Sequence, residues 1–365
     1  MARRTASKKN WRNRISLMGF GISMGLLLSE VTYRLFRPQV PLQSTDSLLN
    51  RGRFTTVGKH WNIQPEFKTE VEVNHFGFVD REWNLTEPPD ILFIGDSFVQ
   101  GAQVPMEKAI GRQLDDNLNS TVWSMGVPGA GTTTEWLLLQ EWLQTVKPKK
   151  VMIGFLPSND ILNNHPALES KSDKPFVDIN TINQSNVSVL MPEPTVDNYP
   201  LARHSHLWRW WLRYSDIEQQ RKEKMSLKGL PRDWDVYNPA ISEIWSEAWM
   251  LTGVLFQQIN KLCKENKIIL NIILFPSIEE VSPAFREQVH QQYPDTDSWN
   301  WNLESQSLSM LEQAGITDAQ ILSLYPIFTN HPTPNALYYP RDKHWTITGH
   351  TLASETIQAW LESSP

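Results

Sequence analysis

The 365-residue chain contains a single cysteine, Cys263, which excludes an intrachain disulfide. Cys263 lies in a segment with the apolar spacing of an amphipathic helix, where a cysteine behaves as a small buried hydrophobic residue. A chain of this length buries a sizeable core without covalent crosslinks. We therefore expect a globular body whose stability depends on its core alone.

Basic residues are scarce outside the N-terminus. The chain has 34 Lys and Arg against 40 Asp and Glu, and six of the basic residues lie between Arg3 and Arg14. The remaining 28 basic and 40 acidic residues give the rest of the chain a formal charge of −12. Nucleic-acid binding requires clustered Lys and Arg. This balance excludes nucleic acid as a partner of the body.

No apolar run reaches the ~20 residues that cross a bilayer as a helix. The uncharged stretch from Ile15 to Ser29 follows the basic head and suits the core of a signal peptide, but no Ala-x-Ala-like cleavage site follows it. Counted from Trp11 to Tyr33, the segment gives about 33 Å of helix with an aromatic residue near each end. We favour an uncleaved transmembrane anchor over a cleaved signal that would yield a secreted protein. The positive-inside rule then places the N-terminus in the cytoplasm and the body outside.

From residue 88 on, apolar runs alternate with helical patterns, which is typical of an α/β fold with a parallel sheet. We divide the chain into a basic head and anchor at 1–38, a stem and edge segment at 39–87, and a body at 88–365 with an insertion at about 162–238. The patterns predict buried strands at 91–94, 121–125, 150–156 and 268–275, an edge strand at 70–74, and helices at 105–118, 133–146, 240–264 and after 346, with some helix between 202 and 225.

The first buried strand ends at Gly95-Asp96-Ser97. Ligands of open α/β sheets bind beyond the carboxyl ends of the strands, and Gly95 allows the backbone to turn sharply there. Ser97 is therefore presented to the crevice rather than to the core. The tripeptide by itself occurs at chance frequency, so its interpretation depends on partner residues.

A serine nucleophile needs a base, and the base needs an orienting group. Asp342 and His344, two residues apart on a segment expected to be extended, follow near the C-terminus. We predict Ser97 as nucleophile, His344 as base and Asp342 as the group that orients it. The alternatives are a surface ion pair, or a metal site that includes His350. No other His or Asp cluster has convincing ligand spacing, so we expect no metal and no cofactor.

Acyl transfer also needs hydrogen-bond donors for the oxyanion of the tetrahedral intermediate. Two further strand ends supply candidates, the backbone N–H of Gly126 and the side-chain amide of Asn159, and Ser97 adds its own N–H. The glycine-rich loop that begins at Gly126 fits neither the P-loop nor the dinucleotide pattern.

As a set, Gly95-Asp96-Ser97, Gly126, Asn159-Asp160 and Asp342-x-His344 resemble the four blocks of the SGNH (GDSL) hydrolase superfamily over residues 88–160 and 240–365. The resemblance implies a three-layer, flavodoxin-like α/β fold and the roles given above. Members are mostly esterases, lipases and carbohydrate acetylesterases, with some O-acyltransferases. Two features depart from the common pattern. The Asp-x-His-Trp spacing resembles a variant of polysaccharide O-acetylation enzymes of bacterial envelopes, and Pro157 stands where many members have glycine.

The sequence therefore predicts a membrane-anchored, extracytoplasmic serine hydrolase of short-chain acyl esters, with an acetylated envelope glycan or an acylated small molecule as substrate. An O-acyltransferase with the same residues and a non-catalytic glycan-binding protein are the alternatives. Trp208, Trp210, Trp211 and Trp234 crowd the insertion, where they suit either a sugar platform or buried packing.

Overall fold

A five-stranded parallel sheet forms the centre of the protein, in the order β4-β3-β5-β8-β9. Numbered along the chain, these strands have the order 2-1-3-4-5 of the flavodoxin-like doubly wound fold. The predicted fold class is confirmed. The strands are β3 (Ile91–Gly95), β4 (Val122–Gly126), β5 (Lys150–Phe155), β8 (Ile269–Leu274) and β9 (Ile321–Ser323). The computed structural model describes residues 2–36, 57–169, 174–181, 187–190, 204–211, 214 and 230–363.

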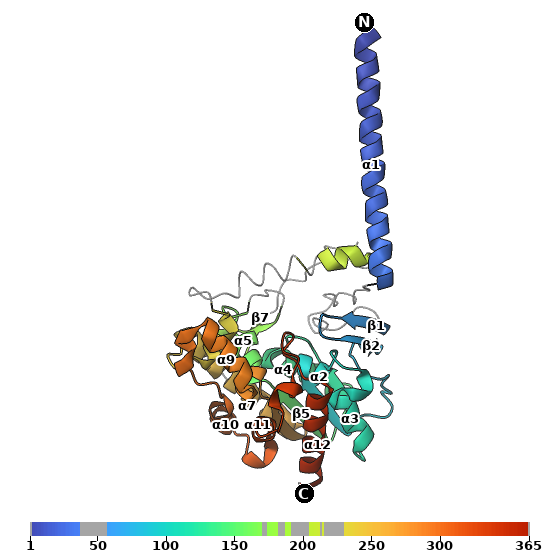
Figure 1. The fold of residues 1–365 in the computed structure, drawn as a ribbon. Helices are drawn as coiled ribbons and strands as arrows, with labels where there is room; N and C mark the ends of the chain where they lie inside the picture. Colours follow the sequence, from blue (N-terminus) through green and yellow to red (C-terminus); the bar gives the residue numbers. More distant parts are fainter. Residues whose placement is uncertain are drawn as a thin grey trace.

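Helices cover both faces of the sheet and make three layers (Figure 1). Along β3, Leu92 and Ile94 pack into the core shared with α4 and α7, whereas Phe93 packs into the core shared with α3 and α12. All residues of β3 and β4 are buried, as apolar runs with two covered faces predict. The covering helices are α3 (Ile110–Asn117), α4 (Thr132–Trp142), α5 (Pro157–Asn163), α7 (Glu243–Glu265) and α12 (Ile347–Ser363).

The four predicted strands and the predicted helices of the body are present, with ends shifted by a few residues. The strand β9 was not predicted, because it has three residues, all half-buried. Of the predicted insertion, most lies outside the described residues. The remaining elements are α2 (Ser97–Gln100), α8 (Ile278–Val281), α9 (Pro283–Gln292), α10 (Glu304–Gln313), α11 (Tyr325–Thr329), the antiparallel pair β6 (Phe176–Val177) and β7 (Val189–Leu190), a helical stretch at 206–211, and 3-10 turns at Met106–Lys108, Ile179–Thr181, Arg232–Tyr237, Pro294–Ser298, Asp318–Gln320 and Pro334–Leu337.

Residues 57–87 pack against the body through an aromatic cluster. The ring of Trp83 stacks on Trp123 of β4 with 4.8 Å between centroids. Burial raises the pKa of Asp80 to about 6, although N–H groups of Ser124 and Trp83 donate to its carboxyl group. The expected edge strand is β2 (Lys68–Val73), which pairs with β1 (Gly58–Ile63) in a separate antiparallel hairpin rather than with the central sheet. Residues 39–56 of the predicted stem lie outside the described residues.

The N-terminal helix α1 (Ala2–Phe36) extends away from the body (Figure 1). Its segment Asn13–Phe36 is long and apolar enough to cross a membrane, and its apolar window is not buried in the protein. A membrane anchor and a signal sequence both have these properties.

Candidate active site

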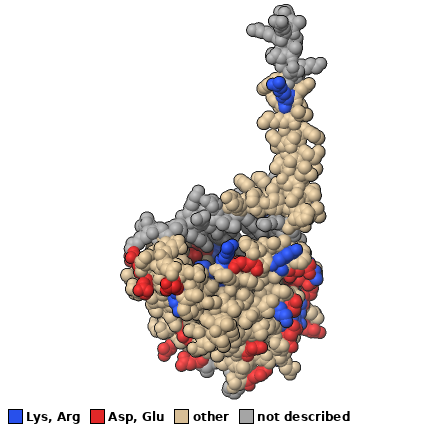
Figure 2. All heavy atoms as spheres, viewed as in Figure 1, with Lys and Arg blue, Asp and Glu red and all other residues tan. Residues whose placement is uncertain are grey.

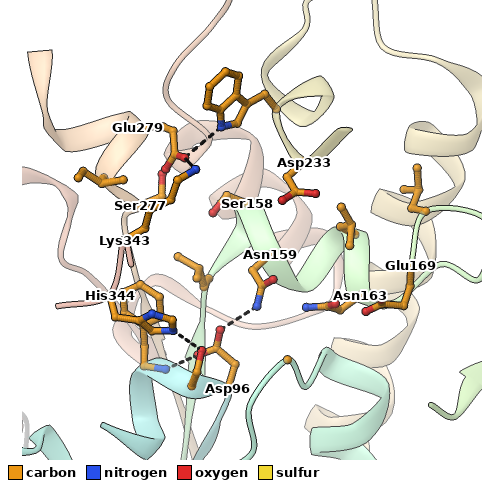
Figure 3. Close-up of a pocket in the computed structure, with 18 of the residues that line it drawn as sticks. Asp96, Ser158, Asn159, Asn163, Glu169, Asp233, Ser277, Glu279, Lys343 and His344 are labelled. Carbon is orange, nitrogen blue, oxygen red and sulfur yellow. Dashed lines mark hydrogen bonds and ion pairs between the residues drawn. The ribbon is translucent and has the colours of Figure 1, made fainter. Parts of the chain in front are cut away.

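Ser97, His344 and Asp342 form a continuous hydrogen-bonded chain. Ser97 is the first residue of α2, directly after β3, and its Oγ lies 2.7 Å from Nε2 of His344. The other ring nitrogen of His344, Nδ1, lies 2.7 Å from Oδ1 of Asp342. The structure thus brings Ser97 together with Asp342 and His344, which lie almost 250 positions later in the sequence. Figure 3 shows the ring of His344 directed toward Asp96 and Asn159 at the base of the pocket.

A tight turn, not the expected extended segment, carries Asp342 and His344. The backbone N–H of Lys343 donates to the carbonyl of Tyr339 at 2.7 Å, and the N–H of Tyr339 donates to the carbonyl of His344 at 2.8 Å. Lys343 has a φ of 69°, in the left-handed region that non-glycine residues seldom adopt. The reversal at Lys343 lets the carboxyl group of Asp342 reach Nδ1 of His344 while Nε2 of the same ring faces Ser97, which explains how a two-residue spacing serves this site.

Two carboxylates from other elements hold this turn from opposite sides. Glu279 of α8 pairs with Lys343, with 2.5 Å between Oε1 and Nζ. Burial alone would raise the pKa of Glu279, but the ammonium of Lys343 lowers it below its usual value. On the other side, Glu66 between β1 and β2 accepts the backbone N–H of Asp342 at 2.7 Å and that of Arg341 at 3.0 Å. Neither carboxylate stands out in the sequence, because both contacts join segments distant in the chain.

Asp96 connects the nucleophile to Asn159. Its carboxyl group is fully buried, where Oδ1 accepts the N–H of Phe98 at 2.8 Å and Oδ2 accepts Nδ2 of Asn159 at 2.9 Å. Burial raises the pKa of Asp96, and the N–H donors partly oppose that shift. The Asn159 amide has two N–H groups, so a second one is available for a ligand. Pro157, which replaces the glycine common in this block, occupies the first turn of α5, a position that favours proline.

The glycine that borders the pocket is Gly129 rather than the predicted Gly126. Gly126 ends β4 beneath α2, where an added Cβ would come within 2.3 Å of the Cα of Gln100. It does not line the pocket that contains Ser97. Gly129 lines that pocket and has a φ of 66°, a conformation that favours glycine. Both belong to the glycine-rich loop after β4, so the sequence located the loop but not the residue.

The serine opens into a pocket of about 320 Å³ at the carboxyl ends of the strands. Lys174 pairs with Glu169 and Lys343 pairs with Glu279. Neither ammonium group is therefore without a counter-charge. The two carboxylates lie on opposite sides of the pocket (Figure 3). The lining contains these two ammonium groups and five carboxyl groups, which come from Asp96, Glu169, Asp233, Glu279 and Asp342. Such a lining disfavours anionic ligands.

The tryptophans of the insertion do not form a sugar platform in this pocket. Trp234 lines the pocket, but Nζ of Lys343 lies 5.2 Å from the centre of its ring. Trp208, Trp210 and Trp211 belong to the helical stretch at 206–211, away from the pocket lining.

The described residues contain no group of three or more His, Cys, Asp or Glu arranged to hold a metal ion. His350, the third member of the alternative metal site, is buried and accepts the backbone N–H of Ile110 at 3.3 Å. Burial lowers the pKa of His350 to about 3, so the ring is neutral. Behind Asp96, burial raises the pKa values of Glu135 and Asp160 well above the usual range. Both carboxyl groups are fully buried in the core.

Comparison with protein-family models finds no match, and comparison with curated proteins finds none. Several solved structures are similar over most of the chain. A member of the lipolytic G-D-S-L family from Veillonella parvula is 12% identical and covers 75% of this chain and 96% of its own, with a TM-score of 0.37. An acetyl xylan esterase is 11% identical over 74% of this chain and 98% of its own, with a TM-score of 0.38. A lipase from a goat rumen metagenome is 14% identical over 74% and 96%, with a TM-score of 0.38. At these identities and scores, the fold assignment stands on the strand order, and the chemistry of the site stands on its own geometry.

Proposed function

We propose that the protein is a serine ester hydrolase of the SGNH type that acts through an acyl-enzyme on Ser97. As the Ser97 oxygen attacks the ester carbonyl, Nε2 of His344 accepts the hydroxyl proton, and Asp342 stabilises the resulting imidazolium. The N–H groups of Ser97, Gly129 and Asn159 stabilise the oxyanion. The proton then passes from His344 to the departing alcohol. Water, activated by the same imidazole, releases the acid and restores the serine.

The hydrogen-bonded chain from Ser97 to Asp342 is the observation that carries this proposal. Two other serines line the pocket, Ser158 and Ser277, and both hydrogen-bond to Tyr237 rather than to an imidazole. The Ser277 hydroxyl lies 2.8 Å from the hydroxyl of Tyr237. A tyrosine hydroxyl can act as a base only after it has lost its own proton, which requires high pH. The Ser277 hydroxyl also hydrogen-bonds to the buried carboxyl group of Glu280, whereas the Ser97 hydroxyl is the one of the three that lies within hydrogen-bond distance of an imidazole.

Covalent labelling tests the assignment. The full-length protein in mild detergent is incubated with a fluorophosphonate probe, and the adduct is located by peptide mass spectrometry. We expect a single adduct on Ser97, its loss in Ser97→Ala, and full labelling of Ser158→Ala, a matched serine of the same pocket. Labelling that persists in Ser97→Ala would refute the nucleophile. An unlabelled protein that still binds glycan would favour the non-catalytic alternative.

The substrate that this site suits best is a short-chain O-acyl ester on a neutral glycan. Polar and charged groups from several elements reach into the pocket, so it matches a hydroxyl-rich ligand better than a long alkyl chain. The excess of carboxyl groups in the lining disfavours acidic sugars and phosphorylated lipids. An acetylated, uncharged polysaccharide of the cell envelope meets both conditions.

An O-acyltransferase reaction is the second candidate, because the pocket has room on two sides of Ser97. The lining extends from Glu169 on one side to Glu279 on the other, with Asn159 and His344 between them (Figure 3). An acceptor hydroxyl bound on one side would replace water in the second step. Incubation with an acetyl donor, with and without an acceptor glycan, distinguishes the two reactions, since only a transferase forms acetylated glycan.

We further propose that α1 remains in the mature protein as an anchor with the N-terminus in the cytoplasm. The length of Asn13–Phe36 and the basic residues before it support this orientation. Intact-mass measurement of protein purified from membranes tests it, since a mature chain that begins after Ser29 would show cleavage.

A further inference from the structure

The helical stretch at 206–211 packs across the end of α1 nearest the body (Figure 1, yellow-green). Glu30 of α1 joins the two helices. Its Oε1 accepts the backbone N–H of His206 at 2.9 Å, and its Oε2 accepts the N–H of Leu207 at 2.9 Å and the hydroxyl of Ser205 at 2.7 Å. Arg34 pairs with Glu30 and also donates to the carbonyl of His204. The first N–H groups of the stretch are therefore satisfied by a side chain of α1.

Aromatic rings continue this contact onto an exposed surface. The ring centre of Trp210 lies 5.3 Å from that of Tyr33 in α1 and 5.7 Å from that of Tyr214. Trp211 lies 5.0 Å from Trp208 on the same stretch. The exposed fractions of Trp210, Trp211 and Tyr214 are 37%, 48% and 58%. A group of exposed aromatic rings is unfavourable in water and marks a surface that contacts a membrane or another protein.

The position of these rings along α1 indicates what covers them. The apolar stretch of α1 ends at Ser29, so Glu30 and Tyr33 mark the boundary of the span on the side of the body. At the other boundary Trp11 is 65% exposed. Tryptophan and tyrosine gather at both membrane–water interfaces because their rings are apolar and their N–H or O–H groups are polar. Figure 2 shows the face of α1 between the body and basic side chains near its far end as uncharged.

We propose that residues 204–211 and Tyr214 form an interfacial segment, with Trp210, Trp211 and Tyr214 inserted among the lipid headgroups beside α1. The segment gives the protein a second membrane contact, which lies in the plane of the interface while α1 crosses it. It fixes the angle between the anchor and the body, because Glu30 binds its backbone and Tyr33 contacts its rings. The proposal rests on the proposed membrane anchor α1 and does not depend on the ester chemistry of Ser97.

Site-directed fluorescence tests the lipid contact in the full-length protein. Cys263 is 1% exposed and its pKa is raised to about 12 by burial, so it does not compete for a thiol-reactive dye under native conditions. An environment-sensitive dye is attached to Trp211→Cys and, as a matched control, to Ile327→Cys. Ile327 is 44% exposed on α11, at the side of the body away from α1 (Figure 1). Both proteins are placed in nanodiscs of zwitterionic phospholipid, at one copy per disc and, in a second preparation, at two copies per disc.

We expect iodide in the buffer to quench the dye at position 211 at least threefold less than the dye at position 327. Lipids with a spin label near the headgroup should quench position 211 and leave position 327 unaffected. Equal iodide quenching at the two positions would overturn the proposal. Protection that occurs only when two copies share a disc would also overturn it, because a second copy of the chain would then be the occupant. Fluorophosphonate labelling of Ser97 in both variants verifies that the body is folded.

Discussion

Replacement of Glu66 by alanine should slow catalysis although Glu66 does not line the pocket. The side chain accepts the backbone N–H groups of Arg341 and Asp342, and so fixes the turn that carries Asp342 and His344. Hydrogen bonds to a charged group contribute about 1.5–3 kcal/mol each. Glu66 is half-buried, so water replaces part of this energy in the variant. We expect a loss of about 1.4–2.8 kcal/mol of positioning energy, which corresponds to a 10- to 100-fold decrease in kcat.

Steady-state kinetics of the full-length protein with a p-nitrophenyl acetate substrate measure this effect. Because Glu66 acts on the turn and does not touch the substrate, kcat should fall while KM stays within about twofold. Glu66→Gln retains an acceptor oxygen and should recover most of the activity. The matched control is Glu70→Ala, in the same hairpin. The side chain of Glu70 pairs with Lys59 at 3.2 Å rather than with the turn that carries Asp342.

Three results would contradict a positioning role for Glu66. A wild-type kcat in Glu66→Ala would show that the turn keeps its geometry without the carboxylate. An equal loss in Glu70→Ala would assign the effect to the hairpin as a whole. A loss confined to KM would place Glu66 in substrate binding instead of positioning.

Three further predictions concern the carboxylate that orients the base, a buried histidine of the core, and the charge of the substrate. Asp342→Asn should lower kcat by about 10³–10⁴-fold, as in other triads. The circular dichroism spectrum should stay the same as that of the wild type, which shows that the variant is folded. His350 has a folded pKa of about 3, below its unfolded value of ~6.5, so the unfolded state alone binds a proton and stability falls as the pH drops through this window. In His350→Gln this contribution is absent. The stability difference between variant and wild type, from urea unfolding in mild detergent, should therefore shift by about 2–3 kcal/mol between pH 6.5 and 4.5; parallel curves would contradict the assignment. Finally, kcat/KM for an acetylated neutral oligosaccharide should exceed that for an acetylated uronate by at least about tenfold at low salt, and added salt should narrow the ratio. Equal rates at low salt would show that the carboxyl groups of the lining do not select substrates.

The central sheet was predictable from the sequence because its strands are buried on both faces. The four longer strands read as continuous apolar runs, and each amphipathic helix between them has a regular apolar face. The strand β9 carries no such signal, since three residues are too few to show a pattern. The alternation at 70–74 predicted a strand but not its partner, because β1 mixes charged and aromatic residues and the pairing depends on the turn between the two strands.

The candidate site was predictable where chemistry dictates the residue type. A nucleophile, a base and an orienting carboxylate must be serine, histidine and aspartate or glutamate, so Ser97, His344 and Asp342 stand out at the ends of elements. Supporting residues lack such constraints. Glu66 contributes only acceptor oxygens to backbone N–H groups, and its position follows from the packing of the hairpin against the body. The choice between the two glycines of the loop after β4 likewise required the backbone geometry.

The bond between Asp96 and Asn159 has a practical consequence for identifying the natural substrate. This bond and the N–H of Phe98 hold the carboxyl group of Asp96, and neither involves the Ser97 hydroxyl. A chain with alanine at position 97 therefore keeps the amide of Asn159 in place and retains a site shaped for an ester that it cannot cleave. Immobilised on beads, that inactive protein becomes a trap. The natural substrate is then the acylated molecule that the inactive protein retains from a membrane extract. The wild-type protein should release the same molecule in its deacylated form.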